Sequence, residues 1–201
     1  VRVVLNFPVT REFLDTLSVD TVICAVGADP ILPEQFGISG DHYVLATDIF
    51  KEGVTLNDRI AIMGGGLVGC ETALHLAECG KKVTVIEMAE DIAMETTPAH
   101  RRGIKVRMGL CPEEAGGKDT RPGLVSPILL TSTRCKAITA QGVIVAGADG
   151  KERLVEADTV ISALGLRSRS ELVEDLRKCK HRFIAIGDCV IPRQVNQAVR
   201  G

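Results

Sequence analysis

The chain has 201 residues with 45% apolar and 25% charged side chains, so it is long enough for one large or two small domains with a hydrophobic core. Its formal net charge of −2 gives no electrostatic footprint for nucleic acid or an acidic membrane, and without Trp it offers no platform for base stacking. No apolar run approaches the ~20 residues that a membrane-spanning helix needs.

The N-terminal part of the chain contains short elements. Residues 1–5 (V-R-V-V-L) have the composition of a short strand, and residues 11–17 that of a helical turn. Residues 20–27 (D-T-V-I-C-A-V-G) predict a buried strand that ends in a glycine. The proline at the end of residues 28–30 then favours irregular chain.

Residues 43–51 predict a short helix, for which Thr47 or Asp48 would be the N-cap. After it, residues 53–58 lead without a clear pattern into the most regular part of the chain. That part begins at residue 59 and ends at residue 87.

Residues 59–87 predict a strand, a glycine turn, an amphipathic helix and a second strand that ends in an acid. Gly64, Gly66 and Gly69 have the G-x-G-x-x-G spacing, in which the glycines allow a tight turn, close approach of a pyrophosphate and close helix–strand packing. The helix N-terminus adds N–H groups and partial positive charge. Glu87 lies about twenty residues further on, where a carboxylate accepts hydrogen bonds from an adenosine ribose.

This unit is therefore predicted to bind a dinucleotide. The alternative is a β-α-β unit of a parallel sheet without a ligand, which does not need three such glycines together with an acid at the strand end. The residues expected at the cofactor are Gly64, Gly65, Gly66, Leu67, Val68, Gly69, Glu87 and Met88.

The chain loses its regular pattern after the second strand. Only residues 104–108 (I-K-V-R-M) resemble a strand, and the sequence does not place the third strand of a Rossmann unit or the helix before it. Glycines and prolines make residues 111–124 an expected irregular or mobile stretch. Strand-like order returns at residues 128–131. Three further short runs predict an antiparallel meander: residues 135–139, 142–146 and 153–156.

Residues 158–165 (D-T-V-I-S-A-L-G) repeat residues 20–27 with six of eight positions identical. This repeat predicts two related units, each closing with a strand that ends in a glycine at a ligand crevice; the alternative is coincidence between two buried strands. A last strand-like run, residues 183–186, ends in Gly187 and Asp188, at the carboxyl end where open α/β sheets bind ligands. A helix could begin at residues 196–200.

Seven scattered cysteines include no C-x-x-C pair, so no metal site is expected. Most stand in strand-like or helical patterns as small apolar residues, which suits a reducing, cytoplasmic location. Cys70 lies beside the glycine turn, where a helix N-terminus can lower a thiol pKa. Its first interpretation is packing between helix and sheet, and a reactive thiol is the alternative.

The chain resembles the two-dinucleotide flavoproteins of the pyridine-nucleotide–disulfide reductase family, more closely the C-terminal modules of the 2,4-dienoyl-CoA reductase and trimethylamine dehydrogenase type. Residues 64–73 look like the family's nicotinamide-binding glycine motif. Residues 21–30 and 159–165 resemble the crossover and return strands between flavin and nicotinamide domains, and residues 186–188 resemble the motif whose Asp bonds the FAD ribitol. The resemblance thereby implies further cofactor-binding residues: Gly27, Ala28, Gly165, Gly187 and Asp188.

The resemblance implies an α/β fold: a Rossmann-like, three-layer, two-dinucleotide-binding flavoprotein fold. Family flavin domains begin with their own glycine-rich β-α-β unit, which is missing here, so we expect a fragment with a truncated FAD domain that does not retain FAD alone. Residues 1–51 are expected to form part of the FAD-type domain and the crossover, and residues 52–157 the NAD(P)-binding domain. Residues 158–201 would supply the return strand and the C-terminal part of the FAD-type domain.

The implied reaction is hydride transfer from NAD(P)H to FAD, in which the protein positions the two rings and no side chain acts as a general acid or base. FAD and the remainder of the parent flavoprotein are the expected partners. The alternative is a module that binds ADP as a structural ligand without hydride transfer.

We expect NAD(H) rather than NADP(H), because Glu87 would repel a 2′-phosphate and no basic residue follows it for several positions. Four basic residues further along could still reach a phosphate: Arg101, Arg102, Lys105 and Arg107.

Overall fold

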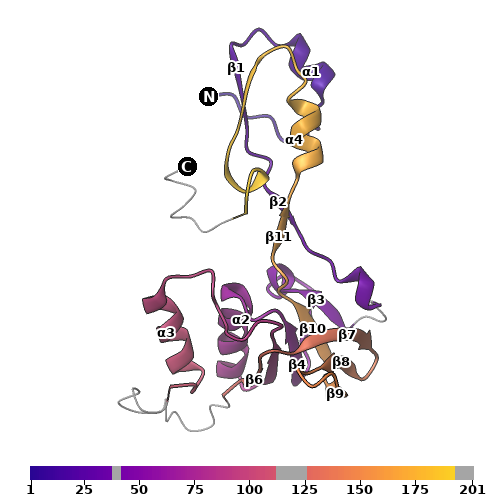
Figure 1. Cartoon of the computed structure of the whole chain (residues 1–201). Helices are drawn as coiled ribbons and strands as arrows, with labels where there is room; N and C mark the ends of the chain where they lie inside the picture. Colours follow the sequence, from indigo (N-terminus) through magenta and orange to yellow (C-terminus); the bar gives the residue numbers. More distant parts are fainter. Residues whose placement is uncertain (38–41, 112–125, 193–201) are drawn as a thin grey trace. The chain divides into compact units, whose positions relative to one another are not determined.

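The computed structural model describes residues 1–37, 42–111 and 126–192, and the chain divides into two compact units (Figure 1). Unit 1 comprises Val1–Ile31 and Leu166–Gly201, and unit 2 comprises Leu32–Gly165. Within the described ranges, no helix is long and apolar enough to cross a membrane.

Unit 2 is built on a parallel sheet with the strand order β3-β10-β4-β5-β6. Helix α2 connects the central strand β4 to β5, and helix α3 precedes β6, as in successive β-α-β units. The bounds are β3 Tyr43–Leu45, β4 Arg59–Met63, α2 Leu67–Glu78, β5 Lys82–Ile86, α3 Pro98–Arg107, β6 Ile128–Leu130 and β10 Thr159–Ser162.

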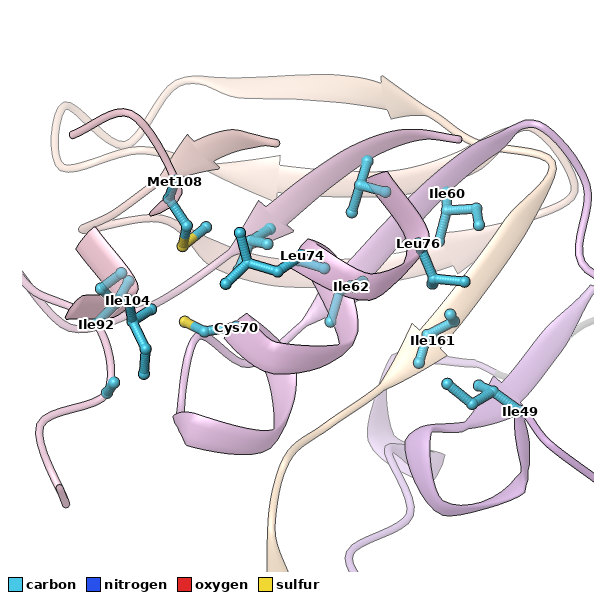
Figure 2. Packing of buried hydrophobic residues seen from close by; sticks show 14 residues of the cluster. Ile49, Ile60, Ile62, Cys70, Leu74, Leu76, Ile92, Ile104, Met108 and Ile161 are labelled. Atoms are coloured by element: carbon cyan, nitrogen blue, oxygen red, sulfur yellow. The ribbon is translucent and has the colours of Figure 1, made fainter. Parts of the chain in front are cut away.

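Successive side chains of β4 point to opposite faces of the sheet and belong to two different hydrophobic clusters. Ile60 and Ile62 pack with side chains of α2 and α3, which Figure 2 shows gathered over the sheet. Ala61 and Met63 belong to a second cluster with the antiparallel meander. The meander consists of β7 (Arg134–Thr139), β8 (Gly142–Ala146) and β9 (Glu152–Glu156), in that order, as the sequence predicts. Unit 2 therefore has three layers: helices, parallel sheet and meander (Figure 1).

Unit 1 contains two small sheets. Strand β1 (Thr21–Cys24) pairs in parallel with β12 (Arg182–Ala185), and β2 (Ala28–Pro30) pairs antiparallel with β11 (Leu166–Ser168). Helices α1 (Arg11–Thr16) and α4 (Ser170–Leu176) supply Leu14, Val173 and Leu176 to a cluster that includes Cys24. Three short 3₁₀ turns complete the described elements: η1 (Glu34–Phe36) and η2 (Ala46–Asp48) in unit 2 and η3 (Gly187–Cys189) in unit 1.

The repeated octapeptides belong to different sheets, which corrects the expectation that both lie in the flavin-type part. Residues 158–165 contain β10, which inserts between β3 and β4 in unit 2, whereas residues 20–27 contain β1 of unit 1. Unit 2 therefore extends beyond the expected 52–157, because both strands flanking β10 belong to its sheet. All four residues of β10 are buried, but in β1 only Cys24 is, so the first strand is not the buried one predicted.

Two local predictions are wrong, and a third is right only in part. Residues 1–5 form no strand; their four apolar side chains are exposed and no described strand pairs with them. Residues 28–30 do form a strand, because Pro30 stands at the end of a two-stranded ribbon, a position that tolerates proline. Residues 43–51 do contain a short helix, the 3₁₀ helix η2, but its N-cap is Leu45 and not Thr47 or Asp48, and residues 43–45 form β3, in which Tyr43 pairs with Val160 of the buried β10.

The predicted strand at 104–108 is instead almost entirely within α3, with Met108 as its C-cap. Thr97 caps this helix by accepting the His100 N–H (3.4 Å), and Pro98 occupies the first turn, where its missing N–H is harmless. Ile104 and Met108 lie four residues apart and both reach the core, a helical spacing. All but the first residue of the predicted irregular stretch 111–124, and the possible helix at 196–200, lie outside the described residues.

Candidate functional site

A pocket of about 520 Å³ lies at the carboxyl ends of the central strands of unit 2. From β4 the chain proceeds to β5 on one side, while the later strand β10 occupies the other side. The strand order therefore reverses at β4, and in open α/β sheets ligands bind at such a reversal point, beyond the carboxyl ends of the strands. The pocket collects five of the residues predicted from the sequence, each following the end of one of these three strands: Gly64, Gly66, Glu87, Met88 and Gly165.

Gly64 and Gly69 hold the helix against the strand end. Gly64 has a φ of +103°, and a Cβ there would lie 2.5 Å from the Ala163 carbonyl oxygen of the neighbouring strand. Its N–H donates to the carbonyl of Ile86 (2.9 Å), which fixes the turn to the end of β5. A Cβ on Gly69 would lie 1.9 Å from the Gly64 oxygen. Both positions therefore require glycine for close approach of backbone segments.

Gly66 is the N-cap of α2 and offers no side chain to the N–H groups of the first turn. The other predicted contacts of this turn, Gly65, Leu67, Val68 and Gly69, are not among the residues that line the pocket: Leu67 packs on the core, Val68 is exposed and Gly69 is buried. The start of α2 thus presents backbone N–H groups that its N-cap residue does not cap, an arrangement suited to an anion.

Glu87 is held by the backbone around it. Its Oε2 accepts the Gly65 N–H (2.6 Å) and its Oε1 accepts the Ala89 N–H (2.7 Å). A Cβ on Gly65 would lie 2.9 Å from the Glu87 Cβ, so the glycine lets the acid lie against the turn. Each carboxylate oxygen keeps capacity for a further hydrogen bond. The side chain is therefore oriented and can still accept from a ligand hydroxyl.

The sequence reasoning missed Glu95, which also lines the pocket. Its Oε1 accepts the N–H of Leu67 in the first turn of α2. The same oxygen would lie 2.8 Å from a Cβ on Gly66. Glu95 belongs to the irregular segment between β5 and α3, so no periodicity or motif pointed to it.

Arg134 was missed as well, and among the described residues that line the pocket it is the only one with a cationic side chain. It begins β7, directly after Thr133, and Cys135 follows it at the pocket wall. Phe36 of η1 adds an apolar contact from the N-terminal side of unit 2. Thr133, Arg134 and Cys135 belong to one segment. This segment is held beside the end of β5, because the Thr133 N–H donates to the Glu87 carbonyl (2.9 Å).

The basic residues of α3 are engaged outside the pocket. Lys105 lies 2.7 Å and Arg101 3.8 Å from Oδ2 of Asp91, whose pKa is lowered chiefly by the hydrogen bond from Lys105. Arg107 lies 3.2 Å from Glu78 of α2. None of the four basic residues noted in the sequence lines the pocket.

Cys70 is a packing residue. It is fully buried between α2 and the sheet, and its Sγ–H donates to the carbonyl of Gly65 (3.2 Å). Burial, reinforced by the charges of Glu95 and Glu87, raises the pKa of the thiol to about 12. Burial likewise raises the pKa of Cys135 to about 11. Neither thiol has the depressed pKa of a nucleophile, so the packing interpretation of Cys70 holds.

Unit 1 carries the other four predicted residues: Gly27, Ala28, Gly187 and Asp188. Cys24 at the end of β1 pairs with Ala185 at the end of β12, and the Ile186 N–H donates to the Cys24 carbonyl (2.9 Å). The two glycines follow with φ values of +74° and +71°. The structure thus brings both predicted segments to the same edge of one parallel sheet.

A family model described as "Pyridine nucleotide-disulphide oxidoreductase" matches residues 7–201. The chain is 32% identical over 171 residues to an NADH oxidase of Thermoanaerobacter brockii, covering 83% of the chain and 24% of that protein. It is 34% identical over 176 residues to a bilirubin reductase of Mediterraneibacter gnavus, covering 85% of the chain and 24% of that protein. The chain thus spans about a quarter of the length of these relatives.

Solved structures also resemble the chain over most of its length, among them the following two. A 2-naphthoyl-CoA reductase in complex with 2-naphthoyl-CoA has a TM-score of 0.75 at 25% identity, over 97% of this chain and 28% of that one. A NAD-dependent persulfide reductase from A. fulgidus has a TM-score of 0.59 at 26% identity, over 86% of this chain and 34% of that one.

Proposed function

Because the chain belongs to the pyridine nucleotide-disulphide oxidoreductase family, we propose that the pocket of unit 2 binds NADH and that, in the complete protein, hydride passes from NADH to FAD. The observation that carries this proposal is the glycine backbone at the start of α2, whose N-cap residue has no side chain, beside an oriented carboxylate at the end of β5. Phosphate and ribose of one nucleotide need these two features side by side.

The residues present fit a dinucleotide. At Gly66 no Cβ stands on the face of the turn that a pyrophosphate must approach, and the exposed side chain of Glu95 is what lies against that face. The pocket volume of about 520 Å³ lies in the range of small-ligand sites. Glu87 retains lone pairs for a ribose hydroxyl, and Met88 and Cys135 supply apolar surface beside it.

When bound, the nicotinamide supplies hydride and the flavin accepts it, so the chain's own residues have only to bind and orient. The first turn of α2 would hold the pyrophosphate through backbone N–H groups, and Glu87 would fix the ribose. Ala163 and Gly165, at the end of β10, line the opposite side of the pocket. None of these roles requires a general acid or base.

The preference for NADH over NADPH rests on charge. Glu87 repels a 2′-phosphate, and Lys105 and Arg101 are engaged with Asp91 instead of facing the pocket. Arg134, a cation that lines the pocket, opposes this preference. We expect the two carboxylates lining the pocket, Glu87 and Glu95, to outweigh it.

A flavin site would be completed by additional polypeptide. Ile23 of β1 is 65% exposed and Ile184 of β12 is 37% exposed, although parallel sheets are ordinarily covered on both faces. The sequence has no second glycine-rich β-α-β unit, and Asp188 alone would contribute only about 1.5–3 kcal/mol as a charged hydrogen-bonding group. The chain by itself is therefore expected not to retain FAD, and the remainder of the parent flavoprotein is its proposed partner.

We propose two further assignments, one of the type of flavoenzyme and one of the cellular location. Similarity to the 2-naphthoyl-CoA reductase supports a place near the 2,4-dienoyl-CoA reductase type of flavoenzyme. All seven cysteines are free, which supports a cytoplasmic location.

Calorimetric titration of the chain with NADH, NADPH and ADP tests the proposal. We expect saturable binding of NADH, tighter than NADPH. In the complete flavoprotein, anaerobic NADH should bleach the flavin absorbance. Binding of ADP without NADH binding or flavin bleaching would support the structural ADP module instead, and no binding at all would contradict both functions.

A further inference from the structure

The proposed phosphate position at the start of α2 already contains an anion. Glu95 accepts the Leu67 N–H, one of the first-turn donors that a bound pyrophosphate would use. Its Oε1 lies against the open face of Gly66, 2.8 Å from where a Cβ would be. One backbone donor and one bare glycine face cannot serve this carboxylate and a ligand phosphate at the same time.

The segment that carries Glu95 is anchored next to the glycine turn. Ile92 and Ala93 are buried, and the Ala93 N–H donates to the Gly65 carbonyl (2.8 Å). Ala93 has a φ of +46°, which is uncommon for a residue with a Cβ and bends the chain sharply. Glu95 follows two residues later and is exposed, so its side chain can leave α2 without disturbing the core.

The charges around the pocket make this contact consequential. Glu87 and Glu95 both line it, and in the part of the chain that the structure describes Arg134 is the one cation that lines it. A pyrophosphate that entered with Glu95 in place would meet two carboxylates near the same turn and lose an N–H donor. The charge of Glu95 would therefore oppose any phosphate-bearing ligand much more than an uncharged one.

We propose that Glu95 is an internal competitor for the pyrophosphate subsite: its carboxylate satisfies the start of α2 in the free protein and must move away when a dinucleotide binds. The inference rests on the proposed function, since it concerns the same pocket. In this role Glu95 lowers the affinity of every ligand whose phosphate must displace its carboxylate. It also predicts that neutralising one carboxylate strengthens binding, the opposite of the result for a residue that contacts the ligand favourably.

The experiment compares Glu95→Gln and Glu95→Ala with Glu90→Gln in the full 201-residue chain. Glu90 is an exposed acid five positions away that does not line the pocket, so its substitution changes the charge equally. Each protein is titrated calorimetrically with NADH, ADP and adenosine, which has no phosphate. Circular dichroism and thermal unfolding establish that each variant is folded.

Both Glu95 substitutions should tighten NADH and ADP about tenfold. Adenosine binding and all Glu90→Gln affinities should change less than about twofold. Unchanged or weaker NADH and ADP binding by the Glu95 variants, with the wild type binding normally, would overturn the inference alone. An equal gain for adenosine would also overturn it, since the effect would then not involve phosphate. If no protein bound any nucleotide, the proposed function would fail together with the inference.

Discussion

Gly69 lies against the carbonyl oxygen of Gly64 so closely that a Cβ on residue 69 would stand 1.9 Å from that oxygen. A Cβ has no rotamer that relieves such a contact, because its position is fixed by the backbone. Any larger residue must therefore push the start of α2 away from the end of β4. The N–H groups of α2 and the strand-end residues that line the pocket depend on this approach.

Gly69→Ala should lower the free energy of unfolding by about 1–3 kcal/mol, the usual effect of overpacking, and weaken nucleotide binding as well. Urea unfolding and calorimetry measure the two effects. Gly103→Ala is the matched control, because a Cβ added at Gly103 of α3 would meet no atom within 4 Å beyond the adjacent helix backbone, so this change should be neutral or stabilising by up to about 1 kcal/mol. A Gly69→Ala protein as stable as the wild type would contradict the packing described here.

Glu87→Ala should weaken NADH binding by about 1.5–3 kcal/mol, because a ribose hydroxyl would lose a charged acceptor. It should also narrow the preference for NADH over NADPH, since the charge that repels a 2′-phosphate is removed. Titration of wild type and variant with both nucleotides gives the two ratios, and Glu90→Ala serves as the control for net charge. Tighter NADPH than NADH binding by the wild type, or an unchanged ratio in the variant, would refute this role.

Cys70 should make the protein less stable at alkaline pH. Its folded pKa of about 12 exceeds the ordinary value of 9.0, so the unfolded thiol loses its proton first as the pH rises. The stability that comes from keeping this thiol neutral is complete below pH 9.0 and is lost between there and about pH 12. Urea unfolding at pH 7 to 10.5 should show the decline, and Cys70→Ala should reduce its slope.

Alkylation provides a second check on the same thiol. At pH 8, iodoacetamide should modify the exposed Cys79 and leave the buried Cys70 unmodified, as read by peptide mass spectrometry. Rapid modification of Cys70 in the folded protein would revive the reactive-thiol alternative.

The two faces of β1 should respond differently to substitution. Ile23 is 65% exposed, whereas Val22 packs against the cluster of Leu14 and Val173. Ile23→Thr should change the free energy of unfolding by less than about 0.5 kcal/mol and reduce self-association, while Val22→Thr should cost about 1 kcal/mol or more. Unfolding curves and light scattering distinguish these outcomes. A large loss of stability from Ile23→Thr would show that this face is covered within the chain itself.

The central unit could be predicted from the sequence because its information is local. Strand periodicity, the glycine spacing and a strand-end acid all lie within residues 59–87, and the structure brings them together as expected. The meander was also predictable, since its strands are neighbours in sequence and pair in order. The glycines of the turn could be interpreted from the sequence, because close approach of two backbone segments excludes a Cβ in any protein.

Features that depend on distant partners were not predictable. The octapeptides at 20–27 and 158–165 are nearly identical, yet one strand pairs with β12 and the other inserts between β3 and β4. Local sequence cannot specify that difference, because the partners lie far away in the chain. Glu95 and Arg134 stand outside any motif and reach the pocket only through the sheet. Helix α3 was not predicted, because residues 104–108 alternate apolar and basic side chains as a strand does, while Ile104 and Met108 also have the i, i+4 spacing of a helix. The N-cap of α3, Thr97, lies seven residues before this pattern.

The most direct test of the central claim is a ¹H–¹⁵N correlation spectrum of the labelled chain titrated with NADH. If the glycine turn and Glu87 form the nucleotide site, the amide signals of Gly65, Leu67 and Ala89 should shift saturably, because two donate to Glu87 and one to Glu95. Gly150, in the turn before β9 and away from the pocket lining, should not shift. Absence of saturable shifts at millimolar NADH, or shifts confined to residues outside the pocket, would contradict the assignment of this site.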